Sequence, residues 1–120
     1  MSESESRSVP RSTRRVLLDE CVPRPLRREF PGLAVSHVVD EGWAGRRNGD
    51  LLQQMLDAGF TVLLTVDRNL AYQQNVAAAG VAVVVVKART NRMRDLRPAV
   101  PTIRAAIESA AIGVVTNVAV

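Results

Sequence analysis

Short apolar runs alternate along the chain with segments of helical spacing, and glycine, proline or polar loops separate the two kinds of segment. The apolar runs have the length of strands. They predict strands over residues 15–18, 33–39, 60–66, 81–86 and 114–120. The segments between them predict helices over residues 26–30, 49–58, 69–79 and 93–111, with prolines that split the last one or mark helix starts.

The predicted strands are apolar throughout instead of alternating between apolar and polar positions, which indicates burial on both faces. Strands that alternate with helices in this way predict a mostly parallel sheet between two layers of helices, an α/β/α domain. We place this domain over residues 15–120 and interpret residues 1–14, which are rich in Ser, Arg, Glu and Pro, as a disordered tail.

Composition narrows the function classes. Hydrophobic residues make up 47% of the chain but aromatic residues only 3%, so recognition of bases mainly by aromatic stacking is disfavoured. The formal net charge is +4, and Lys87 is the only lysine. This arginine-rich balance suits phosphate partners, although a solubilising surface is an equal alternative. One cysteine excludes an intramolecular disulfide and fits the cytoplasm, and no apolar run approaches the length of a membrane span.

Acidic residues follow two of the predicted strands directly. Asp19 comes after Leu18, and Asp67 comes after Val66. Asp50 lies in the first turn of the helix that Asn48 is expected to cap. Because parallel strands present their carboxyl ends at one edge of a sheet, we expect Asp19, Asp50 and Asp67 to converge there.

Crowded carboxylates need a proton or a cation, and oxygen ligands alone suit Mg²⁺ or Mn²⁺. Such an ion can orient a water and stabilise charge on a phosphate, whereas zinc is disfavoured by a single His and a single Cys. Glu20 and Asp95 are possible additions to the set. Each acid also has an ordinary structural alternative: Asp67 as a turn or cap residue, and Asp50 as a partner of the helix dipole.

Four segments in this order resemble the small PIN-like proteins of the VapC toxin superfamily. They are LLDECVPRPLRREF, HVVDEGWAGRRNGDLL, FTVLLTVDRNLAYQQN and VAVVVVKARTNRMRDLRP. The resemblance extends from about Val16 to the C-terminus. It implies a three-layer α/β/α fold, a Mg²⁺-dependent ribonuclease activity and a partner antitoxin, often with self-association.

By motif, the resemblance assigns Asp19 to the first PIN aspartate, Asp50 to the helix acid and Asp67 to the later strand-end aspartate. The family's next acidic position is Asn69 here, which can coordinate through its amide oxygen but brings no charge. This departure places the nuclease activity in question, with Glu20 or Asp95 as possible compensation.

Several arginines are expected in loops or helix starts on the side of the site, where they could contact RNA phosphates or form a solvated rim. They are Arg46, Arg47, Arg68, Arg89, Arg92 and Arg94. We expect Trp43 to cover the edge of the core and His37 to be a packed or hydrogen-bonded histidine. Asn91 is a candidate for holding its loop near the site.

The leading hypothesis from the sequence is a metal-dependent endoribonuclease, the toxin of a type II toxin–antitoxin pair. A PIN-like module that binds RNA or protein through a degraded metal site is the second. A phosphoacceptor regulatory domain is the third, since acids follow the first and third strands and Lys87 ends a later one. That lysine, however, arrives one strand–helix unit too early for such a domain.

Overall fold

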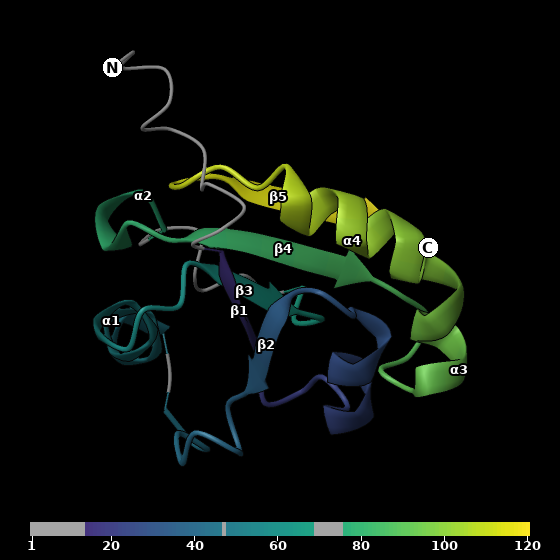
Figure 1. The fold of residues 1–120 in the computed structure, drawn as a ribbon, viewed down its shortest axis with the longest axis horizontal. Helices are drawn as coiled ribbons and strands as arrows, with labels where there is room; N and C mark the ends of the chain where they lie inside the picture. Colours follow the sequence, from purple (N-terminus) through teal and green to yellow (C-terminus); the bar gives the residue numbers. More distant parts are fainter. Residues whose placement is uncertain (1–13, 47, 69–75) are drawn as a thin grey trace.

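The structure is a computed structural model that describes residues 14–46, 48–68 and 76–120. Its centre is a five-stranded, all-parallel sheet in the order β2-β1-β3-β4-β5 (Figure 1). The elements in chain order are β1 (Arg15–Leu18), η3 (Arg24–Glu29), β2 (Ala34–His37), α1 (Asn48–Asp57), β3 (Val62–Thr65), α2 (Val76–Ala79), β4 (Ala82–Lys87), α3 (Met93–Leu96), η5 (Arg97–Ala99), α4 (Val100–Glu108) and β5 (Val115–Ala119).

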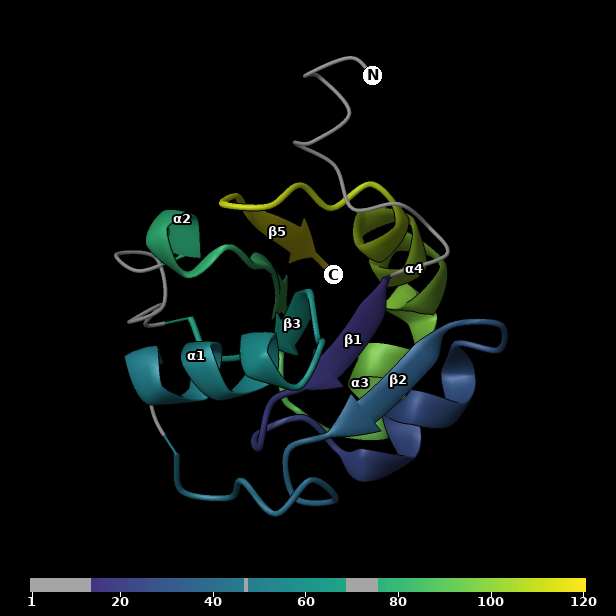
Figure 2. The same ribbon diagram turned by 60° about the vertical axis from the view of Figure 1, so that its left-hand side comes forward.

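Helices cover both faces of the sheet, so the predicted α/β class and the three-layer arrangement are confirmed. Figure 2 shows α1 and α2 on one face, with α3 and α4 on the other. Side chains of β1 alternate between two cores: Val16 and Leu18 join the cluster under η3 and α4, and Leu17 joins the cluster under α1. The inner strands are apolar except at one end of each (Arg15, Thr65 and Lys87) because helices bury both of their faces.

Several elements are shorter than their patterns predict, for local reasons. The strand expected over 33–39 ends at His37 because residues 38–42 form turns. The helix expected over 26–30 is a 3-10 helix that starts at Arg24, with Pro25 near its beginning. The segment expected as one helix over 93–111 is divided into α3, η5 and α4, with Pro98 in η5 and Pro101 in the first turn of α4. Of the helix expected over 69–79, only α2 lies among the described residues.

Two aromatic or imidazole side chains have the structural roles expected of them. Trp43 is 9% exposed and meets Phe60 edge to face, with 5.8 Å between ring centroids, so it covers the edge of the core. His37 is buried. Its Nδ1 accepts a hydrogen bond from the Val39 backbone N–H at 3.0 Å, which leaves Nε2 to donate to the Val22 carbonyl at 2.6 Å. His37 therefore ties the end of β2 to the connection that leaves β1.

Arg14 belongs to the folded domain. It is buried and donates a hydrogen bond to the carbonyl of Glu108 at the end of α4. Arg14, which the sequence pattern places at the end of the tail, is therefore fastened to the end of α4. None of the helices in the described ranges has the length and apolar character that a membrane span needs.

Candidate functional site

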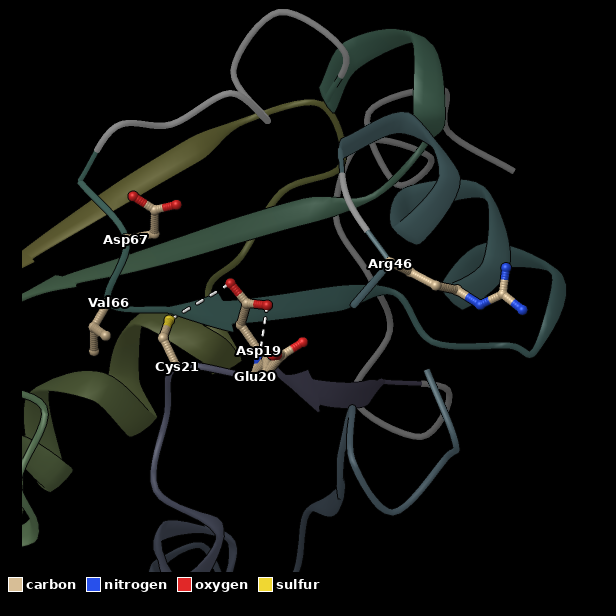
Figure 3. Close-up of a pocket in the computed structure, with 6 residues that line it drawn as sticks. All are labelled: Asp19, Glu20, Cys21, Arg46, Val66 and Asp67. Atoms are coloured by element: carbon tan, nitrogen blue, oxygen red, sulfur yellow. Dashed lines mark hydrogen bonds between the residues drawn. The ribbon is translucent and has the colours of Figure 1, made fainter. Parts of the chain in front are cut away.

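The strand order creates a crevice between β1 and β3. The chain leaves β1 toward β2 on one side of the sheet, whereas β3 and the later strands lie on the other side. This reversal is a topological switch point, and in open parallel sheets ligands bind there, beyond the carboxyl ends of the strands. A cavity of about 450 Å³ lies at this position, lined by Asp19, Glu20, Cys21, Arg46, Val66 and Asp67 (Figure 3).

Asp19 is the most buried acid of this cavity, with 7% of its surface exposed. Its Oδ1 accepts a hydrogen bond from the Glu20 backbone N–H at 2.8 Å, and its Oδ2 accepts one from the Thr65 hydroxyl at 2.7 Å. The backbone N–H of Asp19 donates to the Leu64 carbonyl, which continues the β1–β3 ladder by one residue. The carboxylate is thus held in one orientation at the wall of the cavity.

Thr65 is the residue that the sequence analysis missed. It is fully buried at the end of β3, and its hydroxyl donates to Asp19 while accepting from the Asp67 backbone N–H at 3.1 Å. This single hydroxyl therefore connects the two acids that follow neighbouring strands. A threonine within an apolar strand is ordinary for β structure, so the only sequence signal was its position two residues before Asp67.

Asp67 lies two residues beyond β3 and is partly exposed. Its backbone is held by Thr65, and its side chain lines the same cavity as Asp19. The contact with Thr65 uses the backbone N–H of Asp67. The turn or cap role considered for the Asp67 side chain stays a prediction.

Glu20 and Arg46 complete the polar lining. Oε1 of Glu20 accepts a hydrogen bond from the Gly45 backbone N–H at 2.7 Å, so it fastens the loop before α1 to the end of β1. Gly45 has a positive φ of 87°, a conformation that glycine adopts without strain. In Figure 3 the guanidinium of Arg46 extends away from the carboxylates of Asp19 and Asp67. Arg46 is exposed, so it lines the rim and not the centre of the cavity.

Cys21 adds a thiol to the cavity wall. Its Sγ lies 3.7 Å from Oδ2 of Asp19 and 3.5 Å from the Thr65 hydroxyl oxygen. Burial raises the pKa of the Cys21 thiol, and hydrogen bonds from Thr65 and the Val66 backbone oppose this, while the negative charge of Asp19 adds to it. The group is therefore a protonated thiol at neutral pH that can donate toward Asp19, not a nucleophilic thiolate.

The remaining predicted residues lie outside the cavity lining. Asp50 is exposed in the first turn of α1. Asp95 accepts a hydrogen bond from Thr90 within the loop before α3, and Arg68 donates to the Ala88 carbonyl at 2.8 Å, which holds the end of β3 against the end of β4. Arg89, Arg92 and Arg94 are exposed. Arg47 and Asn69 fall outside the described residues.

Asn91 has the role expected of it. Its side-chain amide donates to the backbone carbonyl of Cys21 at 2.9 Å and so holds the loop after β4 against the segment that leaves β1. Two loops from distant parts of the chain are therefore fastened to this segment, one through Glu20 and the other through Asn91. The cavity wall is rigidly supported where the carboxylate of Asp19 projects into it.

The donor set is compatible with a hard divalent cation. The described part of the chain contains no group of three or more His, Cys, Asp and Glu side chains placed to hold a metal ion. Two carboxylates at one cavity, with room for water, nevertheless match the few protein ligands and several waters that Mg²⁺ prefers. The convergence of Asp50 with Asp19 and Asp67 stays a prediction.

Comparison of the chain with models of protein families, with curated proteins and with solved structures found no match. The fold and the site therefore define the class: an all-parallel α/β domain with two carboxylates at its switch point, joined through one buried hydroxyl.

Proposed function

We propose that this protein is a divalent-metal-dependent endoribonuclease of PIN-like type. The observation that carries the proposal is that Asp19 and Asp67, which follow neighbouring parallel strands, line the same cavity at the switch point. The fixed orientation of Asp19, the space beside it and the arginine-rich chain support a phosphodiester substrate. The resemblance of the four sequence segments to PIN-like proteins points the same way.

In this proposal Asp19 and Asp67, with Asp50 as a further ligand, would hold Mg²⁺ or Mn²⁺. A bound ion would supply positive charge at the scissile phosphate and help to activate water. Thr65 keeps the Asp19 carboxylate turned toward the cavity, and Glu20 holds the Arg46 loop at its rim. Arg46, together with Arg47, Arg68, Arg89 and Arg92, would bind the RNA backbone by charge-assisted hydrogen bonds.

A binding module with a degraded metal site is the second candidate. Two observations favour it: the neutral Asn69 at a position that is acidic in many PIN-like proteins, and the lack, among the described residues, of three or more His, Cys, Asp and Glu side chains placed together to hold a metal ion. Such a module would bind RNA or protein without cutting. The two candidates differ in one property: only the enzyme cleaves RNA, and its cleavage requires a divalent ion.

The test of the enzyme is cleavage of a mixed-sequence RNA by the purified full-length chain. We expect fragments with Mg²⁺ or Mn²⁺ and intact RNA after EDTA treatment, because two carboxylates without an ion repel the phosphate. Readdition of Mg²⁺ should restore cleavage, which serves as the control for irreversible loss of the protein. RNA binding that persists with EDTA, together with no cleavage under any metal, would establish the binding module instead.

We further propose that the enzyme acts in the cytoplasm as the toxin of a type II pair, held in check by an antitoxin. The last strand of the sheet, β5, supports a protein partner because one side of its backbone pairs with no described strand. Exposed aliphatic side chains flank that strand: Ile112, Val114 and Val120. Unpaired backbone and apolar side chains together suit either the antitoxin or a second copy of the chain.

Co-expression with the product of the adjacent reading frame tests the toxin assignment. We expect the two proteins to co-elute and the complex to cleave RNA more slowly than the free chain. Replacing Val114 by aspartate should weaken the complex, since it puts a charge on the apolar surface, whereas Asp57→Asn, which changes an exposed polar side chain at the end of α1, should not. A chain that stays monomeric and does not bind the product of the adjacent reading frame would contradict the toxin assignment but not the nuclease activity.

A further inference from the structure

A second cavity lies on η3, apart from the residues that line the acidic one. Its volume is about 340 Å³, and its lining is Arg24, Pro25, Arg27 and Arg28. Three of these four residues are arginines, all of them exposed. None of them belongs to the arginines expected at the acidic cavity, and the structural role of η3, which buries Leu26 in the core, does not need them.

The carboxylate of Asp40 holds two of these arginines in place but does not neutralise the charge of all three. Asp40, in the turn after β2, forms an ion pair with Arg24 and approaches Arg27, with 3.7 Å between Nη1 of Arg27 and Oδ2 of Asp40. Arg28 forms no ion pair with a described residue. Three guanidinium groups against one carboxylate leave an excess of two positive charges and many unused N–H donors.

The cavity lies at the same end of the sheet as the acidic site. Arg24 follows Asp19 by five residues, so their Cα atoms are at most about 18 Å apart even along a fully extended chain. Asp40 likewise follows the carboxyl end of β2, which pairs with β1. The hydrogen bond from His37 to the Val22 carbonyl holds the end of β2 to the segment between the two cavities.

The lining favours a phosphate over an acidic segment of a protein. Protein interfaces depend on aromatic or aliphatic anchors in desolvated pockets, and the only apolar side chain here is that of Pro25. Planar guanidinium groups donate paired N–H groups that match the oxygens of a phosphate.

We propose that the η3 cavity binds a backbone phosphate of the RNA, upstream or downstream of the nucleotide held at the acidic cavity. This inference rests on the proposed function for its choice of RNA. Arg28 is the principal donor, because Asp40 engages its two neighbours. Arg24 and Arg27, which the Asp40 carboxylate holds in place, supply positive charge around the bound phosphate.

The test is binding of a fluorescein-labelled, mixed-sequence single-stranded RNA to the full-length chain in EDTA, measured by anisotropy at several salt concentrations. We expect Arg28→Gln to weaken binding about three- to tenfold and to reduce the slope of log K against log salt by about 0.7. The double variant Arg27→Gln/Arg28→Gln should weaken binding further. Arg97→Gln is the matched control: the same charge is lost from an exposed side chain outside the cavity, and we expect a change of no more than about twofold.

The outcomes separate this site from the proposed activity. If the cavity variants bind RNA like the Arg97 control, or if the wild-type chain does not bind RNA, the phosphate site is overturned. If the variants lose affinity while the wild type never cleaves with Mg²⁺ or Mn²⁺, the phosphate site stands and the ribonuclease proposal fails. A poly-glutamate peptide that binds as tightly as RNA and loses the same affinity in Arg28→Gln would overturn the choice of phosphate in favour of an acidic protein. Unchanged thermal melts of all variants exclude misfolding as the cause.

Discussion

Replacing Asp19 or Asp67 by asparagine is expected to lower metal-dependent RNA cleavage by at least about 100-fold, because each change removes a negative charge from the proposed ligand set. Asparagine is nearly the same size as aspartate, so the cavity keeps its shape. The measurement is the rate of RNA cleavage at saturating Mg²⁺ for each variant. Asp57→Asn is the control, since Asp57 is exposed at the end of α1, where its side chain accepts a hydrogen bond from Gln53.

The two variants should differ in stability, and this difference tests the hydrogen-bond network. Relief of repulsion between carboxylates by itself favours a metal-free protein of unchanged or higher stability for both variants. Asp19, however, accepts bonds from Thr65 and the Glu20 backbone inside the protein, so Asp19→Asn should cost about 1 kcal/mol of unfolding free energy. Asp67→Asn should cost little. Variants that are both destabilised and still cleave at the wild-type rate would mean that these acids are structural only.

Thr65→Val is expected to have the second-largest effect, on stability and on cleavage together. Valine keeps the shape of the buried side chain but removes the hydroxyl that serves both acids. Loss of the hydroxyl leaves the Asp67 backbone N–H and one Asp19 oxygen without their partner, at a cost of about 1–3 kcal/mol. Because Asp19 then loses one of the hydrogen bonds that orient its carboxylate, cleavage should fall about 10- to 100-fold.

Two measurements make the Thr65 prediction specific. Thr65→Ser retains the hydroxyl and should recover most of the cleavage rate, although it loses some packing of the methyl group. A double-mutant cycle of Thr65→Val with Asp19→Asn, followed by denaturant unfolding, should give a coupling free energy of about 0.5–3 kcal/mol. Additive effects would show that Thr65 acts through packing and not through Asp19.

The sequence alone was sufficient for the architecture and for the position of two acids. Apolar runs without alternation are buried on both faces, and only a parallel sheet between helices buries them so. Asp19 and Asp67 directly follow such runs, and the carboxyl ends of parallel strands share one edge of the sheet. The sequence also predicted that prolines divide the last helical segment, because proline restricts the backbone locally. It predicted the burial of Trp43 as well, because burial follows from the hydrophobicity of the side chain.

Only the tertiary structure decided which polar groups meet. The placement of β1 beside β3 brings the Thr65 hydroxyl to Asp19, 46 residues away in the chain. The same strand order directs Asn91 to the Cys21 carbonyl and Arg68 to the Ala88 carbonyl. The arginines of η3 line one cavity because Asp40, in the turn after β2, forms an ion pair with Arg24 and lies close to Arg27. Hydrophobic burial is periodic along a chain and can be recognised from it, whereas hydrogen bonds and ion pairs require a distance and an angle that only the packed strands establish.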